Sequence, residues 1–232
     1  MVRILLARDD INTYTALMAC CVNGHRNEVL RILLDYEDLD INLPQESDII
    51  NYDDMGRTPL IMACKLGHKE AVQLLLGCPK LDVNMADDEG NTALLMACRE
   101  PLWHLDRELY LGIVRLLLTR DDINVNAQNK DKSTALKMAC DKGKTKVISM
   151  LLKRDEIQMS DQNIEAVVDF VMKRQLNIKD KKDMSAVIDE AVFKNLLDIA
   201  RWLIKTQGYL SRAYTDMAGL CRSKRRSKRK MI

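Results

Sequence analysis

Apolar residues recur along this chain at the spacing of an α-helix, and they do so in pairs of short segments. In the segment that begins at Thr58, Leu60, Ala63 and Cys64 occupy positions i, i+3 and i+4, and the apolar residues within 72–76 repeat the spacing. Such spacing puts apolar side chains on one face of a helix. The pattern therefore predicts two short amphipathic helices joined by a turn.

The same pair of segments is written four times. The first segment of each pair starts at Thr15, Thr58, Thr92 and Thr134, so successive starts are 43, 34 and 42 residues apart. The shortest interval indicates a repeat unit near 34 residues, lengthened twice by insertions of about eight residues. A period of this size is typical of a solenoid, in which each unit buries its apolar face only against its neighbours.

Turn and capping residues mark the ends of the predicted helices. Gly24, Gly67 and Gly143 follow the first segment, where glycine can supply the positive φ of a tight turn. The threonine that opens each first segment is suited to accept a hydrogen bond from the backbone at the start of the helix. After the second segment, a phrase such as 81–84 leads into a polar turn such as 87–90, which predicts a projecting loop or hairpin.

Together these phrases resemble the ankyrin repeat, whose pattern is Thr-Pro-Leu-His-x-Ala followed by a Gly-His turn and a Val-x-x-Leu-Leu helix. The resemblance covers residues 2–204 and implies an all-α ankyrin-repeat solenoid of stacked helix-turn-helix units with projecting loops or short hairpins. The family proline appears only at Pro59, and the family histidine is replaced in every unit. The replacements are Met18, Ile61, Leu95 and Lys137, which leaves open whether the polar contact of that histidine is made here.

We expect one elongated array over residues 1–208, followed by a basic, disordered tail over 209–232. Residues 2–12 match 114–124 at nine of eleven positions, so the array is expected to begin inside a second helix. The expected divisions are a half repeat over 1–12, units near 13–52, 53–86, 87–128 and 129–160, an incomplete unit over 161–179 with a lone helix at 164–172, and a degenerate unit over 180–208.

Composition agrees with an aliphatic helical stack, because 47% of the residues are hydrophobic and only 4% are aromatic. No apolar run approaches the roughly 18 residues of a membrane span, and residues 1–7 do not make a secretory signal. Cys64, Cys98 and Cys140 share one helical position, where they are expected to be small core residues in a reducing compartment. We therefore expect a cytoplasmic protein, with nuclear entry as an alternative.

Candidate chemistry is sparse. The cysteines form no C-x-x-C pair and the histidines are scattered at 25, 68 and 104, so no metal site is expected. Gly143-Lys144-Thr145 resembles the end of a phosphate-binding loop but lacks the first glycine, whose place is taken by Met138. No catalytic constellation stands out, and we expect neither enzymatic activity nor a cofactor. Met62, Met96 and Met138 share another position of the first helices, where they could fill the core or form an adaptable apolar stripe that binds a partner.

The resemblance implies that a partner protein would bind along the loop tips and the exposed positions of the first helices. These positions are Asp54, Met55, Arg57, Lys65 and Leu66 in one unit, Asp88, Glu89, Asn91, Arg99 and Glu100 in the next, and Lys130, Asp131, Ser133, Asp141 and Lys142 in the third. The tips change from acidic at 53–54 and 87–89 to basic at 130, 132, 181 and 182. This order could orient a partner with the reverse order of charge, or it could be an ordinary solvated face.

Two insertions lengthen the array, at 43–51 and 101–111. The second brings in Trp103, His104 and Tyr110. Aromatic residues in a protruding segment can anchor an interface, but Leu105 and Leu109 at helical spacing favour packing of the segment onto its own repeat.

The final segment, 221–232, holds seven basic residues and no acidic residue, whereas 1–220 carry a net charge of −5. A nuclear import signal read by an import receptor is one interpretation, and a solubilising tail, a contact for anionic lipid or a non-specific electrostatic arm for nucleic acid are others. The candidate import residues are Arg222, Lys224, Arg225, Arg226, Lys228, Arg229 and Lys230.

The sequence thus favours a monomeric, non-enzymatic scaffold or adaptor that binds another protein. One alternative is a nuclear or nucleic-acid-associated adaptor that uses the basic tail. Another is a regulatory fragment of a larger ankyrin-containing protein. The fold leaves the partner open, because repeat architectures serve many unrelated partners.

Overall fold

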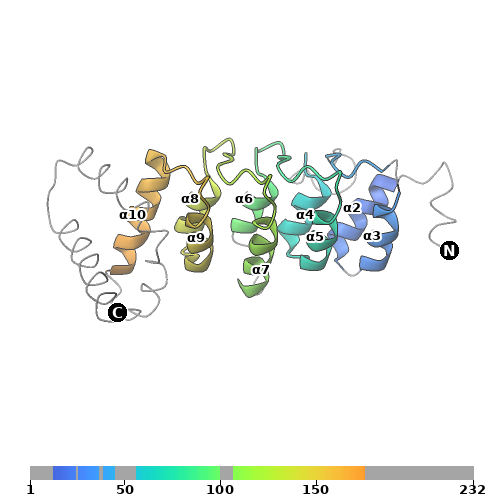
Figure 1. Cartoon of the computed structure of the whole chain (residues 1–232), viewed down its shortest axis with the longest axis horizontal. Helices are drawn as coiled ribbons and strands as arrows, with labels where there is room; N and C mark the ends of the chain where they lie inside the picture. Colours follow the sequence, from blue (N-terminus) through green and yellow to red (C-terminus); the bar gives the residue numbers. More distant parts are fainter. Residues whose placement is uncertain (1–12, 25, 37–38, 45–55, 100–106, 176–232) are drawn as a thin grey trace, which may run out of the picture. The chain divides into compact units, whose positions relative to one another are not determined.

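The computed structural model describes residues 13–24, 26–36, 39–44, 56–99 and 107–175 (Figure 1). The chain divides into two compact units, Met1–Gln158 and Met159–Ile232. The first unit holds the helices α2 (Thr13–Asn23), α3 (Asn27–Leu34), α4 (Pro59–Leu66), α5 (Lys69–Leu76), α6 (Ala93–Cys98), α7 (Arg107–Leu117), α8 (Ala135–Asp141) and α9 (Thr145–Leu152). The second holds α10 (Asp161–Gln175).

Within the first unit the helices stand in two rows, as Figure 1 shows. The first helices of the repeats, α2, α4, α6 and α8, contact one another in chain order, and so do the second helices, α3, α5, α7 and α9. Each first helix also packs on the second helix of its own repeat. The predicted stack of helix-turn-helix units is confirmed.

The two rows are buried to different extents. Every residue of α6 is buried, and so are the residues of α4 from Pro59 to Cys64, because each of these helices lies against its partner and both neighbours. A second helix buries only one stripe, which in α5 consists of Ala71, Val72 and Leu75. The same difference is visible in the sequence. The segment of a first helix is a continuous apolar run, whereas the segment of a second helix has an amphipathic pattern.

Threonine caps the first helices as predicted in three of the four units. The Oγ1 atoms of Thr58, Thr92 and Thr134 accept hydrogen bonds from the backbone N–H three residues later, at 3.4, 3.4 and 3.1 Å. The N–H groups belong to Ile61, Leu95 and Lys137, the positions at which the family histidine is replaced, so the cap does not need that histidine. Such a cap satisfies one of the helix's unpaired backbone donors.

The fourth predicted cap is wrong. Thr15 lies in the first turn of α2, since that helix begins at Thr13. The capping motif of the later units is thus displaced from the start of the helix in this one.

The turns between paired helices follow the glycine prediction. Gly67 has φ 78° and Gly143 has φ 66°. The N–H of His68 donates to the carbonyl of Ala63 at 2.9 Å, and the N–H of Lys144 donates to that of Ala139 at 2.9 Å. These six-to-one bonds with a left-handed glycine are the Schellman ending of a helix, which holds the turn tight.

Asparagine side chains join successive units at the segment after the second helix. Asn42 donates through Nδ2 to the carbonyl of Lys80 at 2.9 Å and accepts from the N–H of Asp82 at 2.8 Å. Asn84 bridges in the same way to Asp122 and Asn124, and Asn126 to Glu156 and Gln158. An amide carries a donor and an acceptor, so one side chain satisfies both backbone groups of the next unit. This ladder fixes the register between units.

The repeated cysteines and methionines lie mainly in the core. Cys64 and Cys98 are fully buried, and Cys140 is 5% exposed, which confirms them as small core residues. Burial raises the pKa of Cys98 and of Cys140 to about 12, so both stay neutral thiols. Met62 and Met96 are buried, whereas Met138 is half-buried.

In the second unit, α10 confirms the helix expected near 164–172 and extends it at both ends. The Oγ of Ser160 accepts from the N–H of Asn163 at 3.4 Å at its start. The degenerate repeat expected over 180–208 and the tail over 209–232 lie outside the described residues. Within the described ranges, no helix has both the length and the apolar character to cross a membrane.

Candidate functional site

The loop at 87–91 is a tight hairpin organised by one carboxylate. The N–H of Asp87 donates to the carbonyl of Asn91 at 3.0 Å, and Ala86 and Thr92 form an isolated antiparallel bridge. The Oδ1 atom of Asp87 accepts from the N–H groups of Glu89 and Asn91 at 3.0 and 2.7 Å. Asp87 is therefore turned inward and only 7% exposed, while Asp88 and Glu89 are exposed. The predicted projecting hairpin is confirmed at this position.

An arginine from the preceding repeat ties into this hairpin. The Nε of Arg57 donates to Oδ2 of Asp87 at 3.4 Å, and the two side chains are 8% and 2% exposed. Asn91 donates to the same carboxylate through Nδ2, at 3.1 Å to Oδ1. Arg57 and Asn91 were both expected at a partner surface, but they are buried and act as parts of the loop's frame. A buried charge needs such compensation, because an unpaired one is costly.

The next loop, at 129–133, uses an asparagine in the same role. The N–H of Asn129 donates to the carbonyl of Ser133 at 3.2 Å, and its Oδ1 accepts from the N–H of Ser133 at 2.9 Å. Its Nδ2 reaches back to Oδ1 of Asn91 at 3.1 Å. Lys130 is exposed, and so are Asp131 and Lys132 at the tip.

Adjacent loop tips contact one another through the backbone. The N–H of Lys130 donates to the carbonyl of Glu89 at 2.9 Å. Gly90 has φ 77°, and a Cβ there would lie 3.0 Å from Cα of Asn129. Glycine is thus required twice over at this position, by the backbone angle and by the close approach of the next loop. The tips form a continuous, braced row, and we call the exposed residues of the two hairpins, Asp88, Glu89, Lys130, Asp131 and Lys132, the tip row.

The first helices α6 and α8 begin directly after the two hairpins, so the C-terminal ends of the first helices, which carry the other predicted residues, lie one helix length away from the loops. Arg99, Asp141 and Lys142 are exposed at these ends, and Lys65 and Leu66 are half-buried. The backbone carbonyls at these ends are taken by the following repeat, since Tyr110 Oη donates to Lys65 O at 2.9 Å and Lys144 Nζ donates to Arg99 O at 3.1 Å.

Tyr110 is the aromatic residue of the 101–111 insertion that lies within the described residues. Its side chain is 3% exposed, and its ring lies 5.8 Å from Nζ of Lys144. Tyr110 therefore packs on the repeats and does not protrude. Trp103 and His104 lie outside the described residues.

The predicted partner-binding residues thus fall into separate groups. Exposed residues are Asp88, Glu89, Arg99, Lys130, Asp131, Asp141 and Lys142. Half-buried residues are Lys65, Leu66 and Ser133, and the buried ones are Arg57 and Asn91. Asp54, Met55, Glu100 and all the candidate import residues, Arg222 to Lys230, lie outside the described residues. Partner binding by the exposed group stays a prediction.

Metal chemistry has no assembled donor set in the described part of the chain, where no group of three or more His, Cys, Asp or Glu side chains could hold a metal ion. Sequence reasoning missed a different feature, a groove of about 900 Å³ between α3 and α5. The groove was missed because its lining comes from the second helices of two successive repeats. In the sequence, the outward residues of each helix taken alone look like ordinary solvent-exposed positions.

Comparison with protein families agrees with the helix pairs. A family model described as ankyrin repeats (3 copies) matches in overlapping stretches, at residues 1–87, 43–106, 78–163 and 109–213. No curated protein matches the chain. The stretches run from residue 1 to residue 213 of 232, and the chain therefore belongs to the ankyrin-repeat family.

Proposed function

We propose that this protein is a non-enzymatic scaffold or adaptor that binds a partner protein through the tip row and the exposed ends of its first helices. Ankyrin repeats are generally protein–protein interaction modules. The finer proposal concerns which surface of this chain makes the contact, and which charges the partner presents.

The braced tip row is the observation that carries this proposal. Its inward residues, Asp87, Asn91 and Asn129, form the bonds that hold the loops, so the outward residues can vary without loss of the frame. A surface held in this way loses little conformational entropy on binding, which favours affinity.

The order of charge supports an oriented partner. The first hairpin of the row exposes two acids, Asp88 and Glu89, and the second exposes Lys130 and Lys132 on either side of Asp131. A partner segment with basic residues opposite the first hairpin and acidic residues opposite the second would match this order. Complementary charges of this kind contribute to specificity and to the association rate.

The experiment is affinity purification with mass spectrometry, comparing the intact chain with a tip variant, Asp88→Asn, Glu89→Gln and Lys130→Gln. The control variant, Asp121→Asn, Glu165→Gln and Lys153→Gln, removes the same number of each charge from exposed positions elsewhere. We expect a partner that copurifies with the intact chain and the control but is lost from the tip variant. Equal recovery with all three proteins, each folded by circular dichroism, would remove the tip row as the contact.

The basic segment 221–232 supports a second function, nuclear import, because its net charge of +7 is concentrated in twelve residues. A fluorescent protein fused to residues 209–232 should accumulate in the nucleus above its level in the cytoplasm. The same fusion with every Lys and Arg of 222–230 changed to Gln should not accumulate there. Uniform distribution of both fusions would leave the tail as a solubilising segment. In that case we propose a cytoplasmic location.

A further inference from the structure

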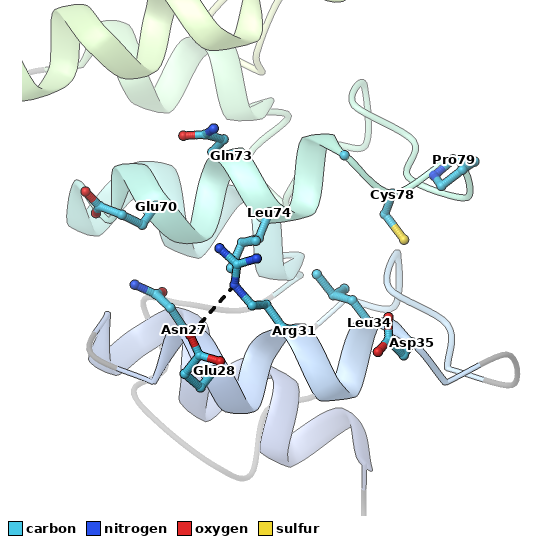
Figure 2. Close-up of a pocket in the computed structure, with 11 residues that line it drawn as sticks. Asn27, Glu28, Arg31, Leu34, Asp35, Glu70, Gln73, Leu74, Cys78 and Pro79 are labelled. Atoms are coloured by element: carbon cyan, nitrogen blue, oxygen red, sulfur yellow. Dashed lines mark ion pairs between the residues drawn. The ribbon is translucent and has the colours of Figure 1, made fainter.

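The groove between α3 and α5 lies in the row of second helices, away from the first helices that carry the proposed partner surface. Its two walls come from successive repeats, and the residues that follow α5, Gly77 to Pro79, line one end. Figure 2 shows the lining side chains of both helices along their length, from Glu28 and Glu70 to Asp35 and Pro79. An eight-residue helix is about 12 Å long, so the groove matches roughly four residues of extended chain.

The chemistry of the groove combines an apolar surface with acidic edges. Leu34 and Leu74 are half-buried in its lining, and Glu28, Asp35 and Glu70 are exposed around them. Arg31 is the basic residue of the lining, and its Nε lies 4.0 Å from Oε1 of Glu28 (Figure 2). Three acids against one base give the lining a net charge of −2.

This acidity is local to α3 and α5. In the later second helices, the position of Glu28 and Glu70 is occupied by Gly112 in α7 and by Lys146 in α9. The position of Asp35 is occupied likewise by Thr119 and then by Lys153. A general requirement for a solvated outer face does not account for a change of sign between equivalent exposed positions.

We propose that the groove between α3 and α5 binds a short segment of another protein that carries a large apolar side chain flanked by lysine or arginine. The apolar side chain packs against Leu34 and Leu74, and the flanking cations pair with Glu28 and Glu70. The site is separate from the tip row, because it lies on the second helices of the repeats. Its partner segment carries only positive charges, whereas the tip row matches a partner with charges of both signs. Its acids come from two successive repeats, so it depends on their stacking.

The test is selection of random 12-residue peptides displayed on phage against the intact protein. We expect a class of peptides rich in lysine or arginine around a large apolar residue. Members of this class should bind the groove variant Glu28→Gln, Glu70→Gln about 3- to 10-fold more weakly, as expected for two exposed ion pairs. The control Asp121→Asn, Glu165→Gln makes the same change of charge away from the groove and should bind like the intact protein. A second variant, Leu74→Ala, removes apolar surface and should also weaken binding.

Cys78 supplies a readout of where the peptide lies, because it lines the groove and is half-buried, unlike the buried Cys64 and Cys98. A saturating selected peptide should slow alkylation of Cys78 by N-ethylmaleimide at least several-fold, as followed by mass spectrometry of the Cys78 fragment. Selected peptides without basic enrichment, equal binding to groove and control variants, or unchanged alkylation of Cys78 would each overturn the proposal. The tip variant should bind these peptides normally, so failure here leaves the tip-row proposal standing.

Discussion

The tip row and the outer faces of the second helices both expose charged side chains, but they are held in place by different means. In the loops, polar residues such as Asp87 and Asn91 are buried and form the frame. In the second helices the frame is an apolar stripe, such as Leu30 and Leu33 in α3, and the polar residues point outward. One surface depends on buried polar bonds and the other on hydrophobic burial.

This difference decides which residues can change freely. In α3 and α5 the exposed charges contribute little to stability: Glu28 and Glu70 lie in the first turn, where a carboxylate favours the helix by about 0.3–1 kcal/mol, and Arg31 forms an exposed pair with Glu28. In a loop, neighbouring acids have opposite roles, since Asp87 supports the hairpin and Asp88 projects from it. Sequence alone makes these two acids look alike, and only the hairpin geometry separates them.

The sharpest test of the comparison is Asp87→Ala. The change leaves Arg57 buried without its carboxylate and removes the acceptor of the N–H groups of Glu89 and Asn91. Breaking a buried ion pair on one side costs about 3–5 kcal/mol of unfolding free energy. Urea unfolding followed by circular dichroism measures this loss.

Asp88→Ala is the matched control for that change, because the same side chain is removed from an exposed position one residue later. We expect a change within about 0.5 kcal/mol. Equal losses for the two variants would show that the hairpin does not depend on the buried carboxylate.

Gly90→Ala tests the close contact between loop tips. The new Cβ would sit at φ 77° and 3.0 Å from Cα of Asn129, which is backbone and cannot move aside alone. We expect a loss of about 1–3 kcal/mol in the free energy of unfolding. Gly143→Ala is the control, since Gly143 has φ 66° but no atom within 4 Å of the added Cβ. It should lose only the intrinsic cost of about 1–2 kcal/mol, and a larger loss there than at Gly90 would contradict a steric role for the tip contact.

Asn84→Ala addresses the ladder between units. It removes a donor to the carbonyl of Asp122 at 2.7 Å and an acceptor for the N–H of Asn124 at 2.7 Å. Both bonds lie in an exposed segment, where water can replace them in part, so we expect a loss of about 1 kcal/mol. Hydrogen exchange of the Asn124 amide should rise in this variant, whereas Asp121→Ala should leave it unchanged.

The local parts of the fold could be predicted from the sequence. A threonine cap, a glycine turn and a stripe such as Leu60, Ala63 and Cys64 depend on residues a few positions apart, so the phrase that encodes them is visible in one unit. Because the phrase is repeated, the stacking of the repeat units and the burial of Cys98 could also be predicted. The cap expected at Thr15 failed because α2 begins at Thr13, three residues before the first helical position that a cap at Thr15 implies.

The contacts between units could not be predicted in the same way. Arg57 and Asp87 are 30 residues apart, and Tyr110 and Lys65 are 45 apart, so no spacing within a unit reveals them. The asparagines at 42, 84 and 126 did carry a signal, since they recur at one position of every phrase. The phrase predicts only a projecting loop or hairpin, and the bonds of these asparagines to the next unit were missed. The acidic groove was missed because it exists only when α3 and α5 lie side by side.

The smallest expected effect concerns a second arginine–aspartate pair, which is exposed and contrasts with the buried Arg57–Asp87 pair. Arg120 donates to both carboxylate oxygens of Asp122, at 2.9 Å from Nε and 2.7 Å from Nη2, and these hydrogen bonds lower the pKa of Asp122. A depressed pKa stabilises the folded state above the pKa of an unfolded aspartate, near 4, and this contribution is lost as the pH falls through the folded value.

Arg120→Gln should therefore raise the pKa of Asp122 toward its ordinary value, as measured by NMR titration of the carboxyl carbon. Unfolding at pH 7 should change far less than in Asp87→Ala, because solvent screens an exposed pair. If Arg120→Gln instead destabilised the protein as strongly as Asp87→Ala, burial would not be what separates the two pairs, and the bond from Arg120 to the carbonyl of Leu76 would become the contact to test.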